Sequence, residues 1–115
     1  SLHNLVTEGL LKLNVAGQEL VNVGTGNGPV NALDAALRKD LGKYSPFLSD
    51  LKLVDYKVRI LTSGTEAVTR VMVESADGKG NRWSTVGVSE NIVDASFEAL
   101  TDSIIYKLHR DGAQV

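Results

Sequence analysis

Three successive runs of alternating apolar and polar residues, joined by glycine-containing turns, constrain the fold of this chain most strongly. In LKLVDYKVRIL (51–61), apolar residues recur at every second position with charged residues between them. AVTRVMVESA (67–76) and RWSTVGV (82–88) follow, after the turn sequences TSGTE and DGKGN. Because successive side chains of a strand point to opposite faces, each run predicts a strand with one apolar face. An apolar helical stripe at 91–109, with Asn91 as its N-cap, completes a β-β-β-α order.

The N-terminal half has a shorter version of the same order. LLKLNVA (10–16) and QELVNVG (18–24) also alternate and predict a β-hairpin. The chain then passes through three glycines into a helix that begins at Pro29, where the missing N–H of proline costs nothing. Gly42 stands where a C-terminal cap is expected. The apolar stripe of this helix has three- and four-residue spacing: Val30, Leu33, Leu37 and Leu41.

The two halves together predict an α+β fold. We expect two similar β-rich modules, β-β-α and β-β-β-α, related by a pseudo-two-fold axis, with each sheet covered by one helix. The modules are placed at about 10–42 and 51–110, within a single domain at 10–110. Residues 1–9 are expected to be a ragged N-terminal segment and residues 111–115 a tail. A chain of 115 residues is long enough for one modest core.

Covering each sheet with a single helix leaves apolar strand surface in contact with water. Val71, Val73 and Trp83 are the candidates for this surface. A symmetric pair of chains would bury it, so we expect a homodimer.

The composition excludes several classes of partner. A net charge of −2 and a pI near 5.6 argue against binding to nucleic acid or to an anionic membrane surface. No apolar run approaches the length of a membrane span, and no signal sequence leads the chain. The absence of cysteine fits a cytoplasmic protein without disulfides or thiolate metal sites. The chain starts at Ser1 and its single methionine is Met72, so we expect a piece of a longer protein.

The glycine-rich passage VGTGNGPVNALDAAL (23–37) raises the question of a phosphate-binding loop. The dinucleotide fingerprint needs a third glycine five residues after Gly24, where this chain has Pro29, and the Walker pattern is absent. Two interpretations remain open from the residues. The glycines can simply permit a tight turn from strand to helix. Alternatively, the free N–H groups and the dipole of the helix start can hold a small anion such as a carboxylate or a phosphate.

No catalytic or metal-binding set is predicted. His3 and His109 lie near opposite ends of the chain, and neither has a ligand-type partner at metal spacing. Serines are plentiful, but none belongs to a recognisable Ser/His/Asp set. We therefore expect no catalytic residue and no metal ligand in this chain.

Three stretches carry a resemblance to a known family: GNGPVNALDAALRKDL (26–41), LVDYKVRILTSGTEAVTRVMVES (53–75) and WSTVGVSENIVDASFEAL (83–100). In this order they resemble the C-terminal regulatory domain of the 2-isopropylmalate synthase and citramalate synthase family. LVDYKVRIL and WSTVGVSENIVDAS look closer to the citramalate synthase branch.

The resemblance implies a role in regulation. Members of the family condense acetyl-CoA with a 2-oxo acid, pyruvate in the citramalate branch, in an upstream TIM-barrel domain that needs a divalent metal. This chain lacks that barrel, so the resemblance implies no activity and no cofactor for the fragment, while the parent chain is an acyltransferase. The implied role is to dimerise, to bind a branched-chain amino acid and thereby to inhibit the barrel of the same chain by feedback. Isoleucine is the expected effector of the citramalate branch. The alternatives are leucine, in the 2-isopropylmalate branch, or a purely structural dimerisation domain.

The resemblance also implies an effector pocket with three walls. The first wall is the glycine loop and the start of its helix: Gly26, Asn27, Gly28, Pro29, Val30 and Asn31. The second wall comes from the first long strand and the turn after it: Leu53, Tyr56, Ile60 and Ala67. Ile92 forms the third wall. Such a pocket suits an amino acid, with its carboxylate on the helix start, its ammonium near Asn31 and its side chain in an apolar cup.

Overall fold

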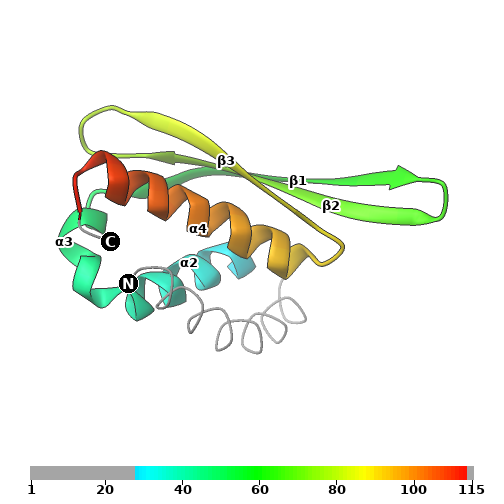
Figure 1. The fold of residues 1–115 in the computed structure, drawn as a ribbon, viewed down its shortest axis with the longest axis horizontal. Helices are drawn as coiled ribbons and strands as arrows, with labels where there is room; N and C mark the ends of the chain where they lie inside the picture. The colour runs from blue at the N-terminus through cyan, green and yellow to red at the C-terminus, as the bar shows by residue number, and fades with distance from the viewer. Residues whose placement is uncertain (1–27, 114–115) are drawn as a thin grey trace.

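The computed structural model describes residues 28–113 of the chain. Its elements are α2 (Gly28–Asp40), η1 (Gly42–Tyr44), α3 (Ser45–Leu48), β1 (Lys52–Ser63), β2 (Glu66–Ala76), β3 (Arg82–Ser89) and α4 (Ile92–Arg110). One sheet carries α4 across one face, and α2 and α3 pack against α4 from the side away from the sheet (Figure 1). The predicted α+β class and the β-β-β-α order of the second half are confirmed. The hairpin predicted at 10–24 lies outside the described residues.

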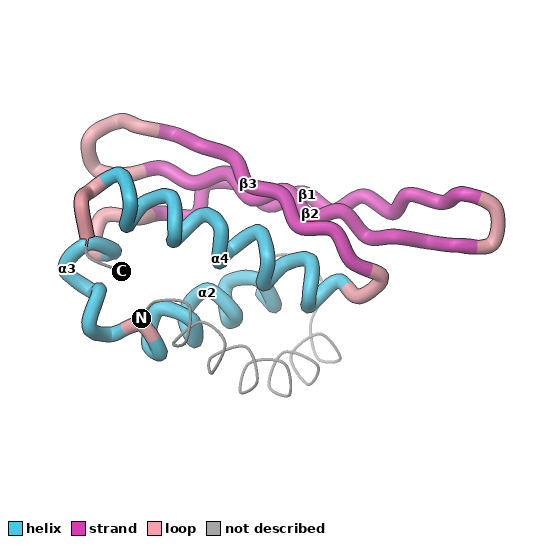
Figure 2. Tube along the Cα trace, viewed as in Figure 1, coloured by secondary structure: helices cyan, strands magenta, loops and turns pink. Residues whose placement is uncertain are grey.

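The three strands form an antiparallel sheet in the order β1-β2-β3 (Figure 2). In the register, Val73 lies opposite Tyr56 on one side and opposite Thr85 on the other. The two hairpin turns contain Gly64 (φ 62°) and Gly80 (φ 84°), backbone conformations that side chains other than glycine rarely adopt. The turns predicted at TSGTE and DGKGN thus each contain a glycine in the conformation that the turn requires.

Small residues let α4 approach the sheet closely. Ala95 and Ala99 are fully buried in the helix face that crosses β3 at Gly87. Hydroxyl groups fill the rest of this contact: Tyr56 Oη lies 2.9 Å from Ser96 Oγ, and Thr85 Oγ1 donates to the carbonyl of Ala99 at 2.6 Å. Because these polar groups find partners, the interface between helix and sheet combines close packing with satisfied hydrogen bonds.

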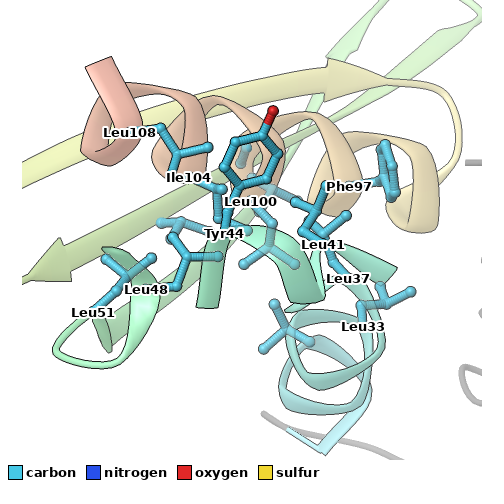
Figure 3. Packing of buried hydrophobic residues seen from close by; sticks show 14 of the residues in the cluster. Leu33, Leu37, Leu41, Tyr44, Leu48, Leu51, Phe97, Leu100, Ile104 and Leu108 are labelled. Atoms are coloured by element: carbon cyan, nitrogen blue, oxygen red, sulfur yellow. The ribbon is translucent and has the colours of Figure 1, made fainter. Parts of the chain in front are cut away.

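The main core lies between α4 and the segment from α2 to the start of β1 (Figure 3). The stripe predicted for α2 is confirmed, since its four residues are at most 2% exposed. Further core residues come from η1, α3, the residue before β1 and α4: Tyr44, Leu48, Leu51, Phe97, Leu100, Ile104 and Leu108. Arg38 holds the connection together by donating to the carbonyls of Leu48 at 3.1 Å and Leu51 at 2.8 Å.

The end of α2 differs from the prediction. The helix stops at Asp40 as expected, but Gly42 does not have the positive φ of a left-handed cap. Instead it begins η1, and the amide of Tyr44 donates to the carbonyl of Leu41 at 2.9 Å. The chain tightens into a 3₁₀ turn because the next core residue, Tyr44, must return to the same apolar layer.

The predicted dimer surface is wrong in its central residues. Val71 and Val73 are 0% exposed, because α4 covers the middle of the sheet within one chain. Trp83 is half-buried, with Nε1 donating to Ser103 Oγ at 3.2 Å. Its ring centroid lies 5.0 Å from that of Tyr106, with the two ring planes tilted by 39°. Any apolar surface left for a second chain therefore lies elsewhere on the sheet.

A buried lysine ties the C-terminal end of α4 to two loops. Lys107 is 1% exposed, and its Nζ lies 3.0 Å from Oδ1 of Asp50 and also pairs with Asp111. Burial disfavours its charge, but the hydrogen bonds that its ammonium donates to Asp111 and Asp50 prevail and raise the pKa of Lys107. Asp50 accepts a further hydrogen bond from the amide of Gly78 at 3.0 Å, which, with Lys107, lowers the pKa of that carboxyl. The cluster joins α4, the connection before β1 and the β2–β3 turn.

Candidate functional site

The hairpin of β1 and β2 extends beyond the rest of the sheet. β3 ends at Ser89, which pairs with Thr69, and Thr69 pairs with Ile60 on its other side. From that pair outward, residues 60–69 form an arm of two strands that projects past the start of α4 (Figure 1). Ile60 is 69% and Leu61 49% exposed, on opposite faces of this arm. The arm therefore presents apolar side chains without cover from the described residues.

Both long helices begin at the end of the molecule from which the arm projects. In Figure 1, α2 and α4 run side by side in the same direction, with their first turns toward the arm. The start of α4 is capped, as predicted, by Asn91, whose Oδ1 accepts from the amides of Val93 at 2.7 Å and Asp94 at 3.4 Å. The first turn of α2 contains no acidic residue. Of the two helix starts, that of α2 is the one without a carboxylate of its own in the first turn.

The first predicted wall is described only in part. Gly26 and Asn27 lie outside the described residues. Gly28 is the first residue of α2 and Pro29 the second. Val30 is 1% exposed and belongs to the core, whereas Asn31 is exposed. Among the described side chains of this wall, Asn31 is thus the one available to a ligand.

The second and third walls are partly brought together. Tyr56, Ile60 and Ala67 lie on the sheet face that α4 occupies, and Ile92 begins α4 where the arm leaves the sheet. Leu53 lies on the same face, but it pairs with Ser75, whose hydroxyl is 2.5 Å from that of Ser103 in the second half of α4. Leu53 and Ile60 lie seven positions apart along the strand, roughly 24 Å. The structure does not bring these two residues into one cup.

The partners of Tyr56 were not foreseen from the sequence. Its hydroxyl is engaged by Ser96 of α4, so this side chain is held in place rather than free to turn. No signal in the strand pattern identifies Ser96, because serine on a helix is usually a surface residue. The available apolar surface consists instead of Ile60 and Ala67 on the arm, with Ile92 half-buried at the start of α4.

Two further observations concern residues 28–113. This part of the chain contains no group of three or more acidic or histidine side chains arranged to hold a metal ion. None of its helices is both long enough and apolar enough to cross a lipid bilayer.

Comparison of the sequence with known proteins matches the chain to a family. The family model described as the LeuA allosteric (dimerisation) domain matches residues 2–108. The chain is 52% identical over 107 residues to an (R)-citramalate synthase of Aquifex aeolicus, covering 91% of this chain and 20% of that protein. It is 54% identical over 107 residues to an (R)-citramalate synthase of Geobacter sulfurreducens, with the same coverage. A 2-isopropylmalate synthase of Aquifex aeolicus is 36% identical over 103 residues, covering 88% of this chain and 18% of that protein.

The chain therefore spans about a fifth of the length of these relatives. The resemblance carried by the three motif stretches is confirmed, and the identities to the two citramalate synthases exceed that to the 2-isopropylmalate synthase. This chain belongs to the LeuA allosteric (dimerisation) domain family.

Proposed function

We propose that this chain is the feedback-regulatory domain of a citramalate synthase, that it forms a homodimer, and that it binds isoleucine. The observation that carries the proposal is the uncovered arm that projects past the start of α4, in a chain of this family. The parent protein is then a cytoplasmic acyltransferase that joins acetyl-CoA to pyruvate in a separate metal-dependent barrel. The fragment itself is expected to have no turnover and to need no cofactor.

Dimerisation follows from the exposed arm. A two-stranded hairpin is marginally stable alone in water, and this one exposes Ile60 and Leu61. Val58 at its base is 37% exposed, which extends the apolar strip toward α4. A second copy that packs its own arm or helix start against this strip would bury it on both chains through one symmetric contact.

Effector binding is proposed at the same end. The carboxylate of an amino acid suits the start of α2, whose N–H groups and dipole favour a negative charge. Its branched side chain can contact Ile60 and Ala67 on the arm face toward α4, and Ile92 at the start of α4. Because α2 packs on the side of α4 away from the sheet, the helix start and the arm that meet one ligand are expected to come from different chains. Because one chain leaves this cup open, the second chain is expected to complete it, which couples effector binding to the dimer.

The arm gives a direct test of dimerisation. We expect the wild-type chain to sediment as a dimer at tens of micromolar and Ile60→Asp to weaken the dimer at least about tenfold, because a charge would be buried in the contact. Val54→Asp is the matched control, since Val54 is an exposed apolar residue (42%) at the other end of β1. A monomeric wild-type chain, or an Ile60→Asp dimer as tight as the wild type, contradicts the proposed surface.

Calorimetric titration with isoleucine, leucine and valine in parallel tests the effector. We expect isoleucine to bind tightest, by roughly 10- to 200-fold, the discrimination that one misplaced methyl group permits. Gly28→Val should abolish the signal by crowding the start of α2, whereas Gly42→Ala, far from that end, should retain it.

Two other outcomes of this titration would favour the alternative functions. Tighter binding of leucine assigns the parent to 2-isopropylmalate synthesis. A stable dimer that binds none of the three amino acids favours the purely structural alternative.

A further inference from the structure

The sheet face opposite α4 carries a cluster of cationic side chains. Figure 1 shows α2, α3 and α4 on one side of the sheet and no described helix on the other. On that second face Lys57 and Arg59 of β1 and Arg70 and Met72 of β2 line a pocket of about 190 Å³. The pocket lies on the opposite face of the hairpin from Ile60 and Ala67, so it is separate from the proposed effector site.

The register places like charges directly against each other. Arg59 and Arg70 are paired residues on neighbouring antiparallel strands, and Lys57 pairs with Met72 one step along the same face. Directly opposed like charges destabilise a sheet, whereas an opposite charge at either position would stabilise it. The opposed pair of Arg59 and Arg70 therefore destabilises the sheet unless a negatively charged group neutralises it.

The acidic residues on this face do not neutralise the arginines. Lys57 makes one long ion pair with Asp55 at 3.7 Å, with both side chains largely in solvent. Glu74 pairs with Arg82 instead, at 3.6 Å. Among the described residues, neither Arg59 nor Arg70 has an ion pair or a side-chain hydrogen bond.

The remaining carboxylate of the hairpin on this face is too distant to help. Glu66 shares the face with Arg70, but the two lie four positions apart along β2, roughly 14 Å. A chain with a net charge of −2 thus holds three cations together with one weakly paired carboxylate beside them.

We propose that this pocket binds a small, doubly charged oxyanion, a phosphate group or a dicarboxylate. Guanidinium groups bind such oxygens through pairs of parallel N–H bonds, and Arg59 and Arg70 stand side by side to do so. Lys57 supplies a third charge, and the Met72 side chain offers an apolar contact for a short carbon chain. The volume suits a group of a few heavy atoms, since pockets for larger organic ligands start at about 300 Å³.

Thermal unfolding of the 115-residue chain tests the site. We expect inorganic phosphate, succinate or both to raise Tm by several degrees at saturation, compared with sodium chloride at the same ionic strength. A response to phosphate alone assigns a phosphate-bearing ligand, and a response to succinate alone assigns a dicarboxylate. A shift no larger than that with chloride for both anions overturns the proposal.

Two variants separate a specific site from general screening of charge. Arg59→Gln and Arg70→Gln should each abolish the anion-dependent shift while leaving Tm without anion unchanged or higher, because each removes the opposed like charge. Arg82→Gln is the matched control: it removes an arginine that lies on the same face but is paired with Glu74, and it should retain the response. An equal loss in Arg82→Gln, or a retained shift in both other variants, rejects the site.

Discussion

Gly87→Ala is expected to destabilise the fold by about 3 kcal/mol or more, near or beyond the usual upper limit for overpacking. A Cβ at this position would overlap the carbonyl oxygen of Ala95 and lie 3.0 Å from the amide nitrogen of Ala99. Both atoms belong to the backbone of α4, so no rotamer change can relieve the clash. The helix would have to move away from β3, which would weaken the hydrogen bond from Thr85 to the carbonyl of Ala99.

Urea unfolding followed by circular dichroism and by the fluorescence of Trp83 measures this loss. Gly42→Ala is the matched control, because a Cβ there would meet no atom within 4 Å and the residue has no positive φ. The control should change stability by less than about 0.5 kcal/mol. Equal stability of Gly87→Ala and the wild type would show that α4 does not pack on β3 as closely as described.

Lys107→Met is expected to cost about 3 kcal/mol, the lower end of the loss when one partner of a buried ion pair is removed. The lysine is 1% exposed, but Asp50 is 37% exposed and can regain water when its partner is gone. Methionine keeps the length of the side chain, so the loss reports the charge more than the packing. Lys52→Met, at an exposed position of β1, should be nearly neutral.

The same variant should change how stability depends on pH. The folded pKa of Asp50 is lowered by the Gly78 amide and by Lys107, so its contribution is present above its ordinary value of 3.8 and is lost as pH falls through the lower, folded value. The pKa of Lys107 is raised, so its contribution is complete below its ordinary 10.5 and is lost as pH rises through the folded value.

Lys107→Met removes one of the groups that lower the Asp50 pKa, so its acid unfolding midpoint should move to higher pH. Denaturant titrations from pH 2 to pH 7 measure this shift. A variant whose midpoint matches that of the wild type would contradict the coupling between Lys107 and Asp50.

Much of the candidate site could be anticipated only through resemblance to a family. The motifs assigned the chain to its family, and the N-cap Asn91 could be read directly from the residues. The cup could not, because residues that share a face of a strand can still lie far apart: Leu53 and Ile60 are seven positions apart along β1. Likewise, Val30 matched the motif of the first wall, yet it is a core residue of α2.

Local patterns in the residues predicted the elements of the second half and the apolar stripe of α2. Alternation with period two and stripes with period 3.6 are local properties, set by how successive side chains leave the backbone. The two turns could be predicted from local sequence as well. Gly64 and Gly80 each have a positive φ, a backbone conformation that glycine adopts more readily than other residues. These features can therefore be predicted from residues that are close together in the sequence.

Which apolar residues of the sheet are buried depends on tertiary contacts. Val71 is fully buried and Ile60 is 69% exposed, although both are apolar residues at alternating positions of neighbouring strands on one sheet face. The difference arises because α4 begins at Ile92 and crosses Val71 but not the arm. Lys107 shows the same dependence, since a lysine is usually a surface residue. It is buried here because Asp50, 57 residues earlier, meets its charge where α4 ends. Burial depends on contacts between segments distant in sequence, which no local pattern records.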